Sequence, residues 1–178
     1  MNGKKLLLVC APALLFGCAS NPAYKLTQVV PEPVAAAAPF EYEFKYDRAK
    51  NGWALVESAP FYLSGQHKKE FIPEVVEFLK PGEPRVNGEA MKQRAKELNA
   101  HFGQHDAEYL LEHQELILKE WRGRHYLVFP GTVWQDSAGH RIIPCLDWRG
   151  DKWGMDFRWL GGDWDDNGRL VRHGKRRL

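Results

Sequence analysis

The C-terminal third of the chain has the pattern that most restricts how this sequence can fold. Four short segments, 126–129, 132–135, 141–149 and 152–160, have strand-type composition, and turn residues separate them, so each segment is predicted to be a strand. A two-residue turn at Gly150-Asp151 brings the last two segments into register. The predicted opposite pairs are Trp148 with Trp153, Leu146 with Met155, Pro144 with Phe157, and Ile142 with Trp159.

A second turn leads to the same face of the sheet. A three-residue loop at residues 137–139, with Gly139 at positive φ, sets Trp134 opposite Ile142,. Two independent turns therefore predict one common core face, as expected when local and global preferences agree. Pro144 has no N–H to donate in what should be a central strand, so a bulge or local break is expected there.

Two helices are expected before these strands. Asn87 can cap the first, which Gly103 would end, and Asp106 can cap the second, in which Glu115 would pair with Lys119 four residues on,. Their apolar stripes are Met91, Ala95, Leu98 and Phe102 in the first, and Ala107, Leu110, Leu111, Ile117, Leu118 and Trp121 in the second. We therefore expect a helical hairpin.

The segment before the helices is predicted to contain strands and one short helix. Residues 40–47 alternate strictly, Asn51-Gly52 is a typical hairpin turn, and residues 53–56 would form the return strand,. Proline punctuation predicts a two-turn helix over residues 74–80,. The predicted fold class is α+β, with the helical hairpin packed on an antiparallel β-meander and an N-terminal strand or hairpin before it.

The N-terminus has the layout of an export signal. Lys4-Lys5 precede an apolar run at residues 6–15, and Gly17 stands directly before Cys18,. The run is about half the roughly twenty residues that a membrane-spanning helix needs. It is therefore predicted to be a signal peptide, residues 1–17, and not a transmembrane helix.

The residues Leu15-Phe16-Gly17-Cys18 resemble the lipobox of bacterial lipoproteins. The resemblance implies cleavage before Cys18, a diacylglycerol on its thiol and usually an N-acyl chain such as palmitate. Ala19 follows, and in the enterobacterial sorting pattern a non-acidic residue at this position implies the outer membrane. An ordinary signal peptide is the alternative.

The mature chain is predicted to be one domain on a tether. Residues 18–39 are rich in alanine and proline and predict an extended linker, residues 40–171 a single domain, and residues 172–178 a basic tail,. The tail is expected to be a solvated terminus, with anionic lipid as the alternative contact. Lys4 and Lys5 leave with the signal, so the mature chain has 23 basic and 23 acidic residues. This balance argues against nucleic acid as a partner.

Conventional catalytic motifs and cofactor-binding motifs are missing from the sequence, and no cofactor is expected,. Cys145 would be the one free thiol of the mature protein. It is expected to be a small buried residue, with a reactive or intermolecular thiol as the alternative. Asp147 and Asp156 could contribute to a glycosidase-like carboxylate pair, but their spacing singles out no pair,.

Tryptophan is the unusual residue type, because six of the seven lie between Trp121 and Trp164, interleaved with aspartates. Aromatic faces with flanking carboxylates suit sugar rings, although the predicted register assigns most of these tryptophans to a core. The candidate ligand surface consists of Trp164, Asp163, Asp165 and Asp166.

The same acidic stretch matches the first half of a calcium loop, with Asp163, Asp165 and Asn167 at alternate positions before Gly168,. The acid expected at the twelfth position is replaced by Gly174. The favoured alternative is a tight turn at Asn167-Gly168 that pairs Asp166 with Arg169 and Asp163 with Arg172. A disordered acidic loop is the third possibility. His101 and His105 have metal-ligand spacing, but Gly103 interrupts the helix between them,.

These features together predict a periplasm-facing lipoprotein of the outer membrane with a non-catalytic binding or scaffolding role in the cell envelope. Its expected partners are the membrane, through Cys18, and an envelope glycan or a protein. An envelope hydrolase acting on cell wall or polysaccharide is the alternative. A small inhibitor or immunity-type lipoprotein is a third hypothesis.

Overall fold

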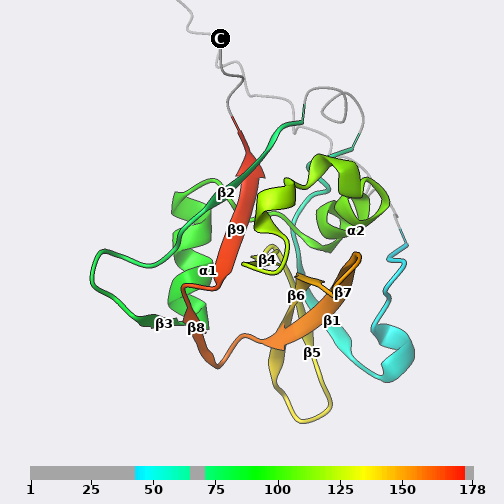
Figure 1. The fold of residues 1–178 in the computed structure, drawn as a ribbon. Coiled ribbons are helices and arrows are strands. Elements are labelled where there is room, and N and C mark those ends of the chain that lie inside the picture. Colours follow the sequence, from blue (N-terminus) through cyan, green and yellow to red (C-terminus); the bar gives the residue numbers. More distant parts are fainter. Residues whose placement is uncertain (1–42, 65–70, 175–178) are drawn as a thin grey trace, which may run out of the picture. The chain divides into compact units, whose positions relative to one another are not determined.

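The computed structural model describes residues 43–64 and 71–174, which belong to one compact unit. The predicted α+β class is confirmed: two α-helices accompany a mixed, strongly curled seven-stranded sheet and a small two-stranded sheet (Figure 1). The predicted signal peptide, Cys18 and the linker lie outside the described residues, as do residues 175–178.

In chain order the elements are η1 (Ala49–Asn51), β1 (Ala54–Ser58), β2 (Pro73–Val76), β3 (Arg85–Asn87), α1 (Gly88–Glu97), α2 (Gln104–Glu112), η3 (Gln114–Leu116), η4 (Lys119–Trp121), β4 (Tyr126–Val128), β5 (Thr132–Gln135), β6 (Arg141–Trp148), β7 (Trp153–Trp159), β8 (Asp163–Asp165) and β9 (Gly168–His173). The large sheet has the order β1-β5-β6-β4-β9-β2, with β7 on β6, and β3 pairs with β8. Strands β4 and β9 are parallel, and all other pairs are antiparallel.

The register predicted for the last two long strands is confirmed pair by pair. Strand β6 places Trp148 opposite Trp153 and Ile142 opposite Trp159, with the intermediate pairs as expected. Trp134 lies opposite Ile142, as the loop ending at Gly139 requires, and Gly139 has φ 85°. Turn chemistry alone therefore determined the pairing of these strands.

Pro144 causes no bulge in the pairing with β7, but the predicted local break lies on its other side, between the residues of β6 that pair with β5 and those that pair with β4. Its pairing with Phe157 is in continuous register, and its carbonyl accepts a hydrogen bond from the Phe129 N–H at 3.1 Å, on the side away from β7. In an antiparallel strand the nitrogen and oxygen of one residue face the same side. The missing donor therefore faces the place where β6 changes neighbours from β5 to β4, and no ladder bond is lost.

Strands β4 and β5 do not form a hairpin, so the predicted four-stranded meander is wrong at Pro130-Gly131. Leu127 lies opposite Leu146, and Trp134 lies opposite Ile142, both in antiparallel pairing with β6. The two strands therefore run in the same direction as one interrupted strand. Residues 129–131 form a jog between them.

The two helices pack on opposite faces of the sheet, so they do not form the predicted hairpin (Figure 1). Ala107 and Leu110 of α2 pack with one set of strand residues, whereas Met91 and Ala95 of α1 pack with the other. Successive strand residues alternate between these cores. The α2-side core includes Leu127, Phe129, Leu146, Trp153, Met155 and Val171, and the α1-side core includes Val128, Val133, Ile143, Cys145, Trp164 and Leu170.

Both helices are shorter than predicted. Asn87 caps α1 as expected, since its side chain accepts the Glu89 N–H at 2.9 Å, but the helix ends before Asn99, whose φ is 52°. Helix α2 starts before Asp106 and ends at Glu112, and the 3₁₀ turns η3 and η4 follow it. Glu115 contacts His113 at 3.3 Å instead of pairing with Lys119.

Two further predictions before α1 are wrong. Residues 43–47 contain no strand, and Gly52 ends the 3₁₀ turn η1 with φ 76° instead of forming a hairpin turn. Residues 73–76 form strand β2, where a helix was predicted, because β9 supplies a ladder for the β-branched Val75 and Val76,. The predicted return strand exists as β1, but its partner is β5.

Candidate functional site

The acidic stretch around Trp164 does not present an aromatic surface. Trp164 is 3% exposed and belongs to the α1-side core, so its ring is not available for stacking against a sugar. Strand β8 pairs with β3, which sets Asp163 opposite Asn87 and Asp165 opposite Arg85. The predicted hairpin with β9 does not form.

The arginines that this hairpin was expected to pair have other carboxylate partners. Arg169 binds Glu77 at 3.1 Å, and Arg172 binds Glu74 at 2.8 Å. Arg172 therefore belongs to the folded sheet as part of β9, and not to a frayed basic tail as predicted. Asp166, which the hairpin would have paired with Arg169, offers its backbone carbonyl to that guanidinium instead.

The candidate calcium ligands hydrogen-bond to each other. Asp165 Oδ1 accepts the Asn167 backbone N–H at 3.1 Å, and Asp165 Oδ2 accepts the Asn167 side-chain amide at 3.2 Å. Within residues 43–64 and 71–174, no three His, Cys, Asp or Glu side chains converge as metal ligands would. His105, one of the two histidines with metal-ligand spacing, stacks on Phe44 with ring centroids 4.1 Å apart.

The structure does bring Asp147 and Asp156 together, on neighbouring strands. Burial and a hydrogen bond with Asp156 raise the pKa of Asp147 against the opposing effect of Arg158. Arg158 donates to Asp147 Oδ1 at 2.9 Å, lies 3.5 Å from Asp156 Oδ2, and stacks over the Tyr126 ring at 3.7 Å. Arg158 therefore contacts both carboxyl groups of the cluster at once.

The carboxyl groups of this pair are held by an arginine and are not set apart around a free space. Glycosidases keep their two carboxyl groups about 5–5.5 Å or about 6.5–9.5 Å apart to accommodate the sugar carbon or a water. Asp147 and Asp156 instead share one guanidinium, that of Arg158, 2.9 Å from Asp147 Oδ1 and 3.5 Å from Asp156 Oδ2. The pair gives no support to the hydrolase hypothesis.

Of the four tryptophans that the register placed in the core, Trp134 and Trp153 are buried, and so is Trp121, which was expected on a helix. Trp121, Trp134 and Trp153 are 7%, 2% and 2% exposed. Trp148 is half-buried, and Trp159, the last residue of β7, is 56% exposed, so its expected place in the core is wrong.

A large groove opens where the sheet divides. At the jog between β4 and β5, strand β1 continues along β5 and β9 continues along β4, so the two outer branches separate. The groove has a volume of about 1270 Å³ and lies at this division; we call it the fork groove. Its lining comes from five segments: residues 59–62, 72–75, 99–102, 118–121 and 172–174.

The jog itself holds the floor of the fork groove in place. The Gly131 N–H donates to the Phe102 carbonyl at 2.9 Å, and the Gly131 carbonyl accepts the Ala59 N–H at 2.7 Å. A Cβ on Gly131 would lie 2.2 Å from the His101 carbonyl oxygen. Only glycine allows this approach, so the link between α1 and α2 is pressed against the division of the sheet.

The walls of the fork groove combine apolar and polar groups. Tyr62 stacks on Phe102 with centroids 4.9 Å apart, and the exposed Ile72 and Leu118 add aliphatic surface. The Glu74–Arg172 ion pair lies in the lining, and Arg172 also donates to the Leu98 carbonyl at 3.3 Å. Apolar surface with a few fixed polar groups is typical of a ligand-binding site.

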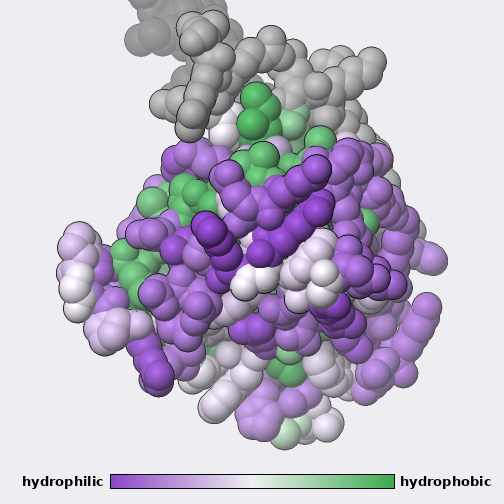
Figure 2. Space-filling model, in the orientation of Figure 1, coloured by the Kyte–Doolittle hydropathy of each residue, from purple (hydrophilic) through white to green (hydrophobic). Residues whose placement is uncertain are grey.

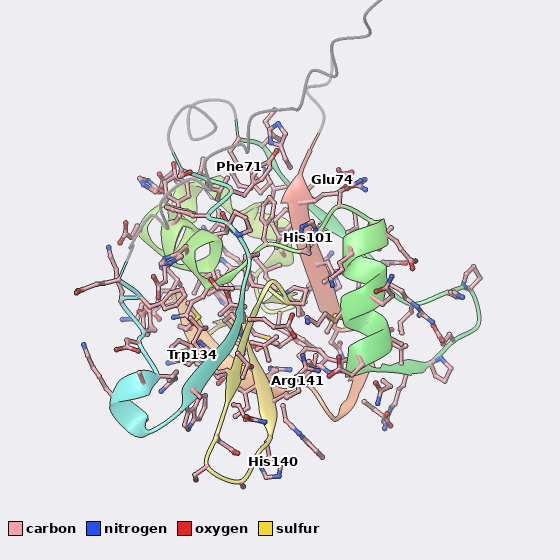
Figure 3. All side chains as sticks on the ribbon, turned by 180° about the vertical axis from the view of Figure 1, so that it is seen from behind. Phe71, Glu74, His101, Trp134, His140 and Arg141 are labelled. Atoms are coloured by element: carbon pink, nitrogen blue, oxygen red, sulfur yellow. The ribbon has the colours of Figure 1, made fainter. Side chains whose placement is uncertain are left out.

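Two residues that line the fork groove, Glu74 and His101, lie toward one end of the domain, whereas Trp134, His140 and Arg141 lie toward the other (Figure 3). Figure 2 shows hydrophobic side chains at the surface near the end of β9. The lining of the groove includes none of Asp163, Trp164, Asp165 and Asp166, so the candidate ligand surface from the sequence and the fork groove are different sites.

Sequence reasoning did not predict this groove, and it considered His101 only as a metal ligand with His105, and Arg172 only as part of the basic tail. The segments that build it are far apart in the chain, and residues 72–75 and 99–102 were assigned to other structures. Gly131 was the one available signal, but its dipeptide with Pro130 suggested only a turn.

Comparisons of this chain with protein-family models, curated proteins and solved structures found no match. In the part of the chain that the structure describes, no helix has the length and apolar character needed to cross a membrane.

Proposed function

We propose that this protein is a lipid-anchored component of the bacterial cell envelope that binds a partner or ligand in the fork groove. Its anchor is Cys18, and its linker spaces the domain from the outer membrane. Its role is binding and not catalysis. The lipobox resemblance supports the location, and the fork groove supports the binding role.

The observation that carries the binding role is the composition of this groove. Its volume of about 1270 Å³ exceeds the roughly 300–1,000 Å³ of a typical small-molecule site, which favours an extended ligand,. Tyr62, Ile72 and Leu118 are each at least 40% exposed, although they lie in one groove. Such clustered exposed apolar residues are typical of interaction sites.

Site-specific photo-crosslinking in cells tests the binding role. A photoreactive phenylalanine derivative in place of Leu118 should yield a covalent adduct with an envelope component. The same residue in place of Lys152, on the turn after β6, should yield none. Mass spectrometry of the adduct distinguishes a protein from a glycan. The proposal fails if neither Leu118 nor Ile72 gives an adduct above the level seen at Lys152.

The anchor has a separate test. Cys18→Ser should abolish labelling by a fatty-acid analogue and release the protein from the outer-membrane fraction. Unchanged labelling would exclude Cys18 as the lipid attachment site. The Leu118 adduct should also disappear in Cys18→Ser if the partner is reached only from the membrane.

A further inference from the structure

The large sheet has three strands with an outer edge, and two of them are blocked. On β7, the Gln114 side chain imitates a neighbouring strand: its Oε1 accepts the Trp153 N–H at 2.9 Å, and its Nε2 donates to the Trp153 carbonyl at 3.3 Å. Arg149 covers the Met155 carbonyl at 2.7 Å. Strand β1 has a bulge between Leu55 and Glu57, which disturbs its edge,.

Strand β2 is short and Pro73 offers no N–H on its outer edge, but among the described residues no side chain and no bulge blocks the outward groups that remain,. The Gly174 N–H donates to the Ile72 carbonyl at 2.7 Å, so Ile72 faces β9, as do Glu74 and Val76 by the alternation of antiparallel pairs,. Val75 then directs both its N–H and its carbonyl away from β9. The Pro73 carbonyl points the same way.

The direction of β9 supports this assignment independently. The Tyr126 N–H donates to the Asn167 carbonyl, so odd-numbered residues of β9 turn their backbone toward β4. Even-numbered residues, including Arg172 opposite Glu74, must therefore bond to β2. Both neighbours of β9 lead to the same result, namely that the outward groups of β2 belong to Pro73 and Val75.

We infer that the fork groove takes an extended polypeptide segment of a partner protein, which adds to the outer edge of β2 as an extra strand. Pro73, Glu74 and Val75 line the groove, so the outer edge of β2 borders it, and no described residue pairs with the outward Val75 N–H and carbonyl. Main-chain pairing at an open sheet edge provides affinity, and alternate side chains provide specificity. The inference rests on the proposed function and specifies its ligand class.

The two faces of β2 define what the added strand must carry. Val75 packs against the α2-side core, and Leu118 and Trp121 line the groove with it. On the other face, Glu74 is already paired with Arg172. The segment should therefore present apolar side chains toward Leu118 and tolerate neutral residues at the alternate positions. A glycan lacks the regular alternation of donors and acceptors that this edge requires.

The probe is a positional library of acetylated and amidated pentapeptides, tested by fluorescence polarisation against the full-length chain with Cys18→Ser. Val75→Pro removes the outward N–H without removing a bond to β9, because proline is tolerated where its missing donor faces away from the ladder. Binding should weaken by about tenfold, as expected for a lost hydrogen bond and a strained edge. Val75→Ile keeps the N–H and should bind like the wild type.

Amide hydrogen exchange on the wild-type chain gives a readout that does not depend on a variant. Bound peptide should slow exchange at the Val75 N–H, whereas the Val76 N–H, which faces β9, should already be slow without peptide. The inference is overturned if no library member binds, or if Val75→Pro binds as tightly as Val75→Ile. In either case the binding role of the fork groove is tested separately, by the cross-link at Leu118.

Discussion

Helices α1 and α2 are held on the two faces of one sheet by different means. Helix α1 starts with a close backbone approach, since a Cβ on Gly88 would lie 1.8 Å from the Leu160 carbonyl oxygen. Helix α2 starts with a buried polar network around Gln104 and Asp106, both of which are 0% exposed. A close steric contact does not respond to pH, whereas a buried carboxyl group does.

The polar network of α2 connects three parts of the chain. Asp106 accepts the N–H groups of Leu63 at 2.9 Å and Gly103 at 3.0 Å. Gln104 accepts the Trp134 indole N–H at 2.7 Å and donates to Glu108 at 2.8 Å. Burial raises the pKa of Asp106 to about 6, although the backbone donors oppose this change. The network therefore includes one carboxyl group that titrates in a mildly acidic range.

The largest loss of stability is expected at Gly88, where α1 approaches the Leu160 carbonyl closely. Gly88→Ala should lower the free energy of unfolding by at least about 3 kcal/mol, because a backbone carbonyl cannot move aside as a flexible side chain can. Gly162→Ala is the matched control, since its Cβ would find only ordinary contacts. Chemical denaturation measures both. Equal midpoints for the two variants would contradict the close approach of α1.

The second effect is a pH dependence on the α2 side. The pKa of Asp106 rises from 3.8 to about 6 on folding, so the folded state holds the proton more tightly. Its contribution to stability is complete below about pH 4 and is lost as the pH rises through 6, by about 3 kcal/mol in total. Denaturation at a series of pH values measures it. Asp106→Asn should remove this part of the pH dependence of the free energy of unfolding. An unchanged pH dependence in that variant would exclude Asp106 as its source.

A smaller effect is expected from the neighbouring amide. Gln104→Met should cost about 2 kcal/mol, because the Trp134 indole N–H and the Tyr46 carbonyl lose their buried partner,. Gln135→Met on β5, at an exposed hydrogen bond to the Gly139 carbonyl, is the control and should cost little. Thermal unfolding compares them. Similar losses in both variants would show that the α2 network adds no more than a surface contact.

The smallest effect is expected from an ion pair at the rim of α1. Lys92 binds Glu57, and this contact together with Arg141 lowers the pKa of Glu57 against partial burial. Lys92→Met should change stability by less than about 1 kcal/mol, since the aliphatic stem is retained and Glu57 stays partly exposed. A loss as large as that of Gly88→Ala would mean that charge, and not close packing, holds α1.

The sequence predicted what local turns determine. The β6–β7 and β5–β6 registers follow from short loops, and the structure reproduces them down to single pairs. The pairs β1–β5, β2–β9, β4–β9 and β3–β8 join distant segments, for which no turn supplies a register. For this reason we predicted a strand from the alternation at residues 40–47 and a helix from the prolines around residues 74–80, and both predictions were wrong.

The fork groove could not be predicted for the same reason. Its walls come from five segments, and its cause is a jog that looks in sequence like an ordinary Pro130-Gly131 turn. The constraint at Gly88 was also hidden, because it depends on Leu160, far along the chain. Polar pairs such as Asp147 and Asp156 were visible in the sequence, but only the strand register brought them together.

Cys145 allows opening of the domain to be followed through the reactivity of its thiol. It is the one cysteine in the described part of the chain, it is 0% exposed, and burial holds the pKa of its thiol well above the ordinary value. Its side chain lies in the α1-side core, so a reagent can reach this sulfur only after the packing of α1 on the sheet has opened,. The rate at which Cys145 is alkylated therefore reports how often this side of the domain opens, without any added label.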